Sequence, residues 1–465
     1  MSTEVIRENQ FGGLDKSLSH LKLPELTNVE LSETKAIQKF KRGLNEGELF
    51  PVGIELSSPE AGQEMAEFES QVNVFPITDV QTQEEQLKKL FERFTPNVVC
   101  DTPDYLQKFN KFLEERGYTS DTSIKKQLQN TGSIFYFPVG VSTKGKLQVE
   151  KRRFFPEAVQ YEILTASEWE LLSPEAKNKL RNSHLTAVGL SVGSQNVEAA
   201  LLAGVTSFDI ADPTRLHTDA QGRLGDFGYD ERFLGVNKTA MILYKIMERY
   251  PYADIKAFYD GLTIDNKDVM FDSEKMEKQE GRGIWFVSEE ADNFDAKALT
   301  RQGIRALPEG IEWHVIMIGD VGHRAAFFHE TKADEPFLGF LRKIDPNKNP
   351  YGRGVVEKYD SLMALFASIG GFEGIPEPLL SQIAEGKIGN FPQAKITRVP
   401  QSREATLLTG AVFSGALRLI AEGKPVTGRQ VLDLRQSLSI SPDSKKQEQA
   451  LQKIMNEKMF GFEEF

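Results

Sequence analysis

Residues 179–216 have the sequence KLRNSHLTAVGLSVGSQNVEAALLAGVTSFDIADPTRL. An apolar run of strand length, Leu185 to Leu190, is followed by a loop of small residues, Ser191 to Ser194, and then by a helical pattern from Gln195 to Ala203. A second apolar run, Thr206 to Ala211, completes the unit. This order of strand, tight loop, helix and strand predicts two parallel strands joined by a crossover helix.

The same alternation continues toward the C-terminus. Ile284 to Val287 and His314 to Ile318 are further candidates for buried strands, and Leu407 to Glu422 has the small and apolar composition of a buried helix. The charged segment Asp272 to Arg282 is expected to be a solvent loop. Residues 151–465 are therefore predicted to form one α/β domain, Rossmann-like, with a mostly parallel sheet and crossover helices.

Residues 1–150 have a different pattern and are predicted to form a smaller α+β domain. Apolar residues recur at helical spacing in Glu84 to Phe94 and again between Thr102 and Gly117, whereas Ser133 to Val141 is rich in β-branched and aromatic residues and is predicted to be a strand. At the other end of the chain, Ser444 to Lys458 has the charge pattern of an amphipathic surface helix.

Composition narrows the class of protein. The 465 residues carry a formal net charge of −12, which argues against binding along a nucleic-acid backbone. The single cysteine, Cys100, excludes a disulfide framework within the chain and fits a reducing compartment. The longest apolar stretch, Leu407 to Ala421, is too short to span a bilayer, and residues 1–10 have no apolar core of a signal peptide. We expect a cytoplasmic protein outside the membrane.

The loop between the first strand and helix has the residue types of a phosphate-binding turn. Gly189, Ser191 and Gly193 are small enough for backbone N–H groups and the helix N-terminus to approach a phosphate. Asp212 ends the second strand, 19 residues past Gly193, where a carboxylate can accept hydrogen bonds from ribose hydroxyls. The alternative is an ordinary strand-to-helix turn, because the full dinucleotide pattern is not present.

Three charged residues favour a nucleoside polyphosphate over a nicotinamide cofactor. Arg223 and Lys238 follow Asp212 and are two cations that can hold phosphates. Asp292, with Asn293, follows the predicted strand Ile284 to Val287, where an acidic side chain can hold Mg²⁺. The structural alternatives are that Arg223 and Lys238 are solvated surface charges and that Asp292 caps a helix.

Residues Lys179 to about Leu299 resemble the adenylation domain of the ThiF-like family, relatives of the ubiquitin-activating enzymes. The stretch quoted above is similar to that family's first strand, glycine loop, helix and ribose-binding strand. GVNKTAMILYKIMERYPYADIKAFYDGLT (235–263) is similar to its lysine helix and third strand, and SEEADNF (288–294) to its metal-binding Asp-Asn turn. Arg223 lies 11 residues after Asp212, as the family's arginine does after its aspartate.

The resemblance implies an ATP- and Mg²⁺-dependent enzyme that adenylates a carboxylate, usually as a homodimer in which the partner subunit completes the site. It implies that Asp212 holds the ribose, that Arg223 and Lys238 hold the phosphates, and that Asp292 holds the metal. The substrate would be a carboxylate such as the C-terminus of a peptide or small protein, with residues 1–150 as a module that recognises it.

The sequence departs from the family pattern at several points. Ser191 and Val192 replace a further glycine of the loop, and Ala220 and Gly222 stand where the family has asparagines before its arginine. The family's paired CxxC zinc motifs and its downstream acceptor cysteine are absent, since Cys100 lies upstream of the domain. The resemblance therefore implies transfer of the adenylate directly to an amine or similar nucleophile, or its use in a cyclisation.

Two alternative functions use part of the same residue set. A NAD(P)- or flavin-dependent oxidoreductase would use Gly189, Gly193 and Asp212 but gives no role to the two cations and Asp292. A non-catalytic nucleotide-binding or interaction protein of the same fold would bind ATP without turning it over, which the missing asparagines favour.

Overall fold

The structure is a computed structural model of the chain. It describes residues 28–47, 51–56, 96–101, 132–141, 147–155, 157–166, 171–217, 220, 224–225, 227–277, 283–291, 294–321, 324–336, 403–426 and 428–433. The helices predicted at Glu84 to Phe94, at Thr102 to Gly117 and at Ser444 to Lys458 lie outside these residues.

The N-terminal part contains a four-stranded sheet in the order β1-β3-β4-β2. Its strands are β1 (Val52–Leu56), β2 (Pro96–Asp101), β3 (Gly132–Val141) and β4 (Leu147–Phe154). The predicted strand from Ser133 to Val141 is confirmed as β3. The predicted domain boundary at residue 150 falls within β4, which pairs along its length with β3.

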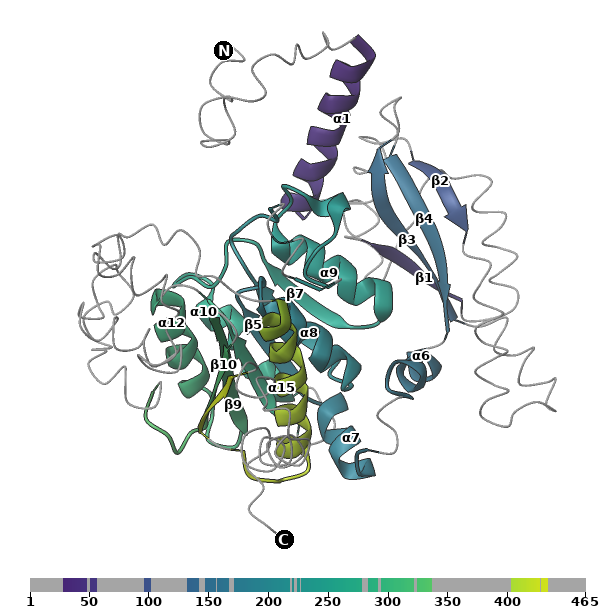
Figure 1. The fold of residues 1–465 in the computed structure, drawn as a ribbon. Coiled ribbons are helices and arrows are strands. Elements are labelled where there is room, and N and C mark those ends of the chain that lie inside the picture. Colours follow the sequence, from purple (N-terminus) through teal and green to yellow (C-terminus); the bar gives the residue numbers. More distant parts are fainter. Residues whose placement is uncertain are drawn as a thin grey trace, which may run out of the picture.

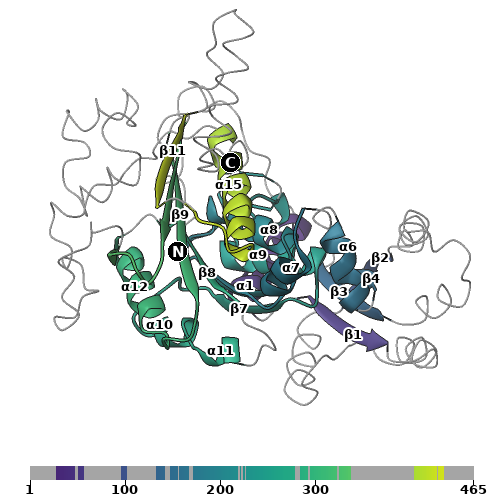
Figure 2. The ribbon, with the colours of Figure 1, turned by 90° about the horizontal axis from the view of Figure 1, so that it is seen from below.

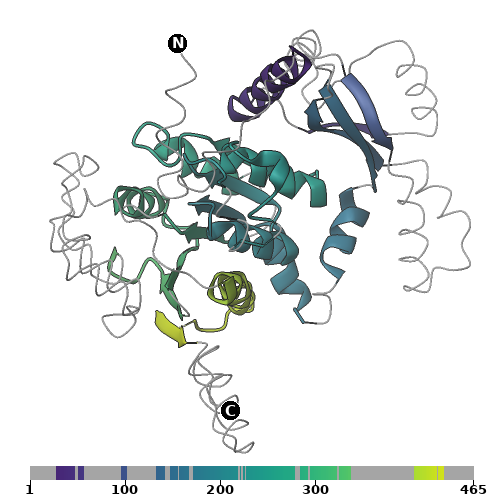
Figure 3. The same cartoon turned by 45° about the horizontal axis from the view of Figure 1, so that its top comes forward.

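Aromatic side chains join this sheet to the rest of the protein. The ring of Phe135 on β3 packs edge-on against Phe154 of β4, with centroids 5.6 Å apart, and against Tyr252, with centroids 6.0 Å apart. Tyr252 belongs to the larger domain, so the small sheet is attached through a buried aromatic cluster. Helix α1 (Asn28–Asn45) packs beside β3 and lies with the small sheet on one side of the larger domain (Figures 1 and 3).

The larger domain is built on a seven-stranded sheet in the order β11-β10-β9-β8-β5-β6-β7. The pairs β5–β6, β5–β8, β6–β7 and β8–β9 are parallel. The strands are β5 (His184–Val188), β6 (Ser207–Ala211), β7 (Asp254–Phe258), β8 (Trp285–Glu289), β9 (Trp313–Val321), β10 (Arg324–Glu330) and β11 (Arg429–Asp433). The predicted α/β fold with a mostly parallel sheet is confirmed.

The sheet ends on one side in two antiparallel strands that the sequence pattern does not predict. β10 pairs antiparallel with β9, and β11 pairs antiparallel with β10. Only five residues of β11 pair, and its sequence, RQVLD, is too short and too polar for a strand to be predicted from its pattern. The sheet is therefore mixed at this edge and parallel at its centre.

The remaining described helices are α6 (Glu157–Leu164), α7 (Pro174–Arg181), α8 (Gly193–Leu202), α9 (Lys238–Arg249), α10 (Lys267–Met270), α11 (Glu274–Glu277), α12 (Phe294–Arg305) and α15 (Arg403–Ala421), and a 3₁₀ turn spans Glu231–Phe233. Helices cover both faces of the large sheet, and alternate residues of each strand point to opposite faces. Leu185 and Ala187 of β5 pack in the core on the α8, α9 and α15 side, whereas Val188 packs on the α10 and α12 side (Figure 2). No helix in the described part of the chain is long and apolar enough to cross a membrane.

The charged segment Asp272 to Arg282 is not a simple loop. Its residues Glu274–Glu277 form the single helical turn α11, whereas residues 278–282 lie outside the described chain. The helix predicted from Leu407 to Glu422 is confirmed as α15, which spans Arg403–Ala421. It is buried on one face only, since Phe413 and Leu417 lie in the core whereas Leu407 is 43% exposed.

A histidine pair on β9 and β10, in which His329 is buried, is expected to make stability depend on pH. His329 is 7% exposed, and its Nε2 lies 2.8 Å from Nδ1 of His314. Burial, together with the neighbouring His314, lowers the pKa of His329 from 6.5 to about 4. The unfolded chain therefore binds this proton more readily, and we predict that the free energy of unfolding falls by about 2 kcal/mol between pH 7 and pH 5.

Urea unfolding at the two pH values measures this loss, and His329→Gln separates it from the contributions of other groups. The variant should lose less stability than the wild-type protein over the same interval, because glutamine does not titrate. Equal losses in the two proteins would show that His329 is not held neutral by the fold.

Candidate functional site

The topology of the large sheet has a switch point at the C-terminal ends of β5 and β8. The chain leaves β5 through α8 to β6 and then β7 on one side, and it leaves β8 through α12 to β9 on the other side. Helices α8 and α12 lie on opposite faces of the sheet (Figure 2). In open α/β sheets, ligands bind where neighbouring strands send their connections to opposite faces in this way.

Gly189 allows the two connections at the switch point to touch. Its φ is +89°, and a Cβ built on it would lie 2.7 Å from both the carbonyl carbon and the carbonyl oxygen of Glu290. The N–H of Glu290 donates to the carbonyl of Val188 at 2.8 Å, and the N–H of Gly189 donates to that of Ala211 at 2.9 Å. Glycine is therefore required here both by the backbone conformation and by the close approach.

The glycine loop leads into a helix whose N-terminus has no side-chain cap. Helix α8 begins at Gly193, and Val192 at the N-cap position makes no side-chain hydrogen bond to it. The Ser194 hydroxyl instead donates to the Ser191 carbonyl at 2.7 Å, which holds the loop in shape. The first turn of α8 contains no acidic residue, so the helix dipole favours an anion at this end.

Asp212 lies at the end of β6 and is 5% exposed. Its Oδ2 accepts from the N–H of Leu190 at 2.7 Å, and its Oδ1 accepts from the N–H of Thr214 at 2.8 Å and from the Thr214 hydroxyl at 2.5 Å. The carboxylate thus joins the glycine loop to the loop after β6. Three of its roughly four lone-pair sites are used by the protein itself, so its predicted contact with ribose has one site available and stays a prediction.

Lys238 faces the glycine loop. It is the first residue of α9, its side chain is 12% exposed, and its Nζ donates to the Ser191 hydroxyl at 2.5 Å and lies 3.9 Å from Oδ2 of Asp212. The structure therefore brings Gly189, Ser191, Asp212 and Lys238 together, with Gly193 at the start of the adjoining helix. The alternative of a solvated surface charge is wrong for Lys238.

Arg223 and Asp292 themselves lie outside the described residues. Their chain neighbours are placed: Leu224 is buried in the core, and the N of Ala291 lies within 2.8 Å of a Cβ built on Gly189. Ala291, the residue before Asp292 in the chain, therefore lies directly beside the glycine loop. The phosphate role of Arg223 and the metal role of Asp292 stay predictions.

A buried network of charges fixes the chain between Glu289 and Ala291. Glu289, at the end of β8, accepts from the N–H of Ala291 at 3.1 Å, from Nζ of Lys297 at 2.8 Å and from Nη1 of Arg301 at 2.6 Å. Arg301 also donates through Nε to Glu330 on β10 at 3.1 Å. Burial alone would raise the pKa of Glu289, but Lys297 and Arg301 outweigh it and hold the pKa below its ordinary value.

Sequence reasoning did not single out this network or Asn237. Glu289 and Glu330 are far apart in sequence and each pairs with Arg301, and no local pattern predicts these ion pairs. Asn237 is different, because an asparagine directly before a helix is a recognised N-cap signal. Its Oδ1 accepts from the N–H of Thr239 at 2.7 Å, which caps α9 and fixes the helix turn that carries Lys238.

The described residues contain no group of three histidine, cysteine, aspartate or glutamate side chains that could hold a metal ion. Mg²⁺ bound together with a nucleotide needs only one or two protein carboxylates, because phosphate oxygens and water supply its other ligands. The donor set in the described part of the chain therefore does not form an all-protein metal site, and a contact of Asp292 with a nucleotide-bound Mg²⁺ stays a prediction.

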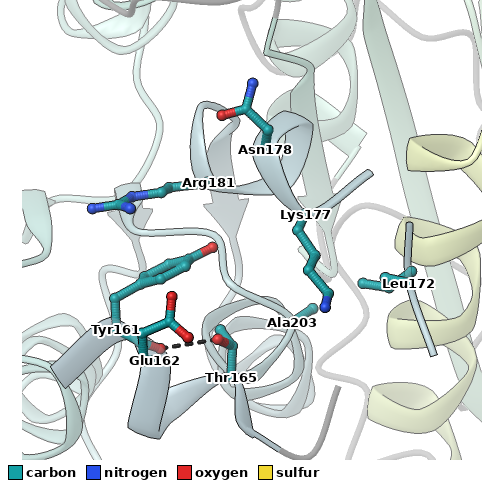
Figure 4. Close-up of a pocket in the computed structure, with 8 residues that line it drawn as sticks. All are labelled: Tyr161, Glu162, Thr165, Leu172, Lys177, Asn178, Arg181 and Ala203. Carbon is teal, nitrogen blue, oxygen red and sulfur yellow. Dashed lines mark hydrogen bonds between the residues drawn. The ribbon is translucent and has the colours of Figure 1, made fainter. Parts of the chain in front are cut away.

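A hollow of about 190 Å³ lies at the opposite end of β5 from the glycine loop, between α6 and α7. Tyr161 and Arg181 are among its lining residues (Figure 4), and the Arg181 guanidinium stands 4.5 Å from the centre of the Tyr161 ring. The Tyr161 hydroxyl donates to the Gly204 carbonyl at 3.1 Å, and burial raises the pKa of Tyr161 to about 12. The hollow lies beside the N-terminal ends of the parallel strands. It is therefore separate from the switch point, which lies at their C-terminal ends.

The close approach at Gly189 gives a direct test of the site's architecture. We predict that Gly189→Ala lowers the free energy of unfolding by about 2 to 4 kcal/mol, because alanine is strained at this φ and its methyl group overlaps the Glu290 backbone. Gly310→Ala is the matched control, since nothing lies within 4 Å of a Cβ built there. Chemical denaturation compares the two, and equal stability of both variants would contradict the contact.

Comparisons with known proteins give only distant likenesses. No protein-family model matches the chain, and no curated protein matches it. Among solved structures, PaaA matches with a TM-score of 0.37 and 11% identity over 60% of this chain and 77% of its own. E. coli MccB, in a structure with ATP, matches with a TM-score of 0.34 and 14% identity over 55% of this chain and 62% of its own. The match thus spans less than two thirds of MccB, and likeness at this level assigns neither family nor activity.

Proposed function

We propose that the switch-point site binds ATP and that the protein activates a carboxylate by adenylation. The observation that carries this proposal is the position of Lys238, whose ammonium group lies on Ser191 of the glycine loop and 3.9 Å from Asp212. A cation on a glycine loop, beside a helix N-terminus whose N-cap side chain makes no hydrogen bond, is an arrangement that can receive a phosphate chain. The ThiF-like sequence resemblance supplies the reaction class.

The reaction has two steps. A carboxylate oxygen of the substrate attacks the α-phosphorus of ATP, the bond from that phosphorus to the bridging oxygen breaks, and pyrophosphate leaves with the electron pair. A nucleophile then attacks the acyl carbon of the adenylate and releases AMP. Negative charge spreads over phosphate oxygens in the first step, so Lys238 and the N–H groups of the glycine loop would lower its barrier by stabilising that charge.

Arg223 and Asp292 complete the proposal. Arg223 would donate to the phosphates as a second cation, and Asp292 would bind the Mg²⁺ that neutralises phosphate charge when ATP is bound. The placement of Ala291 against Gly189 supports the second assignment, because the next residue in the chain is Asp292.

The acceptor of the activated carboxylate is proposed to be a nucleophile other than cysteine. The single cysteine, Cys100, belongs to β2 of the small sheet and not to the sheet that carries the site. An amine of a second substrate, or a cyclisation, fits this arrangement. We further propose a peptide or small-protein C-terminus as the carboxylate, recognised by the N-terminal region, and a cytoplasmic homodimer as the working form.

Calorimetric titration with ATP and Mg²⁺, and in parallel with NAD, tests the binding half of the proposal. Wild-type protein should bind ATP, and Lys238→Ala should bind it about 10- to 100-fold more weakly, because a charge-assisted hydrogen bond is lost. Arg249→Ala is the matched control, because Arg249 ends the same helix and forms an exposed ion pair with Glu198. Binding of NAD in preference to ATP would favour the oxidoreductase instead.

Pyrophosphate release in the presence of carboxylate substrates tests the catalytic half. Loss of Lys238 should reduce turnover about 30- to 1000-fold, which corresponds to about 2 to 4 kcal/mol of transition-state stabilisation. Tight ATP binding without pyrophosphate release, across a panel of peptide C-termini, would identify a non-catalytic nucleotide-binding protein.

A further inference from the structure

The last turn of α1 packs against the connection that leads into α9. Leu44 is buried in the core, and Nζ of Lys41 donates to the carbonyl of Leu234. Asn45 Oδ1 accepts from the N–H of Asn237 at 2.7 Å. Figures 1 and 3 show this end of α1 reaching the chain just before α9. The N-terminal region thus makes a polar contact with the residue that precedes Lys238.

Asn237 connects the elements that surround the candidate site. Its Nδ2 donates to the carbonyls of Asp212 at 3.1 Å and Tyr259 at 3.0 Å, the residues that follow β6 and β7. Its Oδ1 caps α9 through Thr239. Asn237 is 7% exposed, and Asn45 provides the acceptor for its backbone N–H. Loss of the Asn45 amide would leave a buried donor without its partner, which is costly.

The position of the Lys238 side chain depends on the same first turn of α9. Its backbone N–H donates to the carbonyl of Thr214 at 3.0 Å, and its Nζ reaches Ser191. A change in the direction of the first turn of α9 therefore moves the ammonium group relative to the glycine loop.

We propose that Asn45 is a positioning residue of the nucleotide site, which holds Lys238 against the glycine loop by fixing Asn237. The proposal rests on the proposed function, since it requires ATP at Lys238. It makes α1 part of the nucleotide site. Because coupling between two sites is reciprocal, bound ATP then stabilises the docking of α1, and the N-terminal region senses whether nucleotide is present.

ATP binding by four proteins tests this proposal: wild type, Asn45→Ala, Asn45→Asp and, as the matched control on the exposed face of the same helix, Lys35→Ala. Asn45→Ala should raise the Kd for ATP about 5- to 30-fold. Asn45→Asp keeps an oxygen acceptor and should stay within about threefold of the wild type, as should Lys35→Ala.

A double variant separates positioning from a general structural role. If Asn45 acts through Lys238, adding Asn45→Ala to Lys238→Ala should weaken ATP binding no further. Hydrogen exchange of residues 40–47 in the wild-type protein, with and without ATP, gives a second readout that needs no variant, and ATP should slow this exchange.

The outcomes distinguish the two proposals. If the wild-type protein does not bind ATP, the proposed function fails, and the role of Asn45 fails with it. If it binds ATP but Asn45→Ala binds equally well, or weakens binding by the same factor with and without Lys238, only the positioning role is overturned. If Asn45→Ala does not fold, unchanged exchange of residues 40–47 on ATP binding overturns it.

Discussion

At the C-terminal ends of the neighbouring strands β5 and β8, the backbone of Gly189 lies directly against that of Glu290, and the geometry of the site follows from this contact. A side chain at residue 189 would occupy the space of the Glu290 carbonyl. Because no side chain separates them, the loops after β5 and β8 meet at the point where the sheet's connections diverge to opposite faces. Ala291 and the start of α8 are thereby both placed beside the glycine loop and Glu290.

Hydrogen bonds from two carboxylates, one after β6 and one at the end of β8, fix the positions of the loops after β5 and β8. On the β8 side, the buried Glu289 carboxylate binds the N–H of Ala291 together with Lys297 and Arg301. On the β6 side, Asp212 binds the N–H of Leu190. A buried ion pair contributes little net stability, but removing one of its two partners is costly because the other charge is left buried and unpaired. We therefore expect this network mainly to fix the position of the chain after β8. Preorganised polar groups of this kind are what stabilisation of a charged transition state requires.

The sequence pattern predicted the central parallel strands and the glycine loop because their signals are local: buried runs of apolar residues, and small residues between a strand and a helix. It also predicted Lys238 in the site, through spacing and resemblance. It did not predict β10 and β11, whose pairing with β9 depends on contacts between distant segments, or the ion pair between Arg301 and Glu330. The division into residues 1–150 and 151–465, and the roles of Arg223 and Asp292, stay predictions.

A crystal structure with a non-hydrolysable ATP analogue and Mg²⁺ would show where the nucleotide lies. We expect the triphosphate between the glycine loop and the chain that follows β8, within hydrogen-bond distance of Nζ of Lys238 and of backbone N–H groups near Ser191. A nucleotide bound elsewhere, such as in the hollow between α6 and α7, with the Lys238–Ser191 contact unchanged, would contradict it.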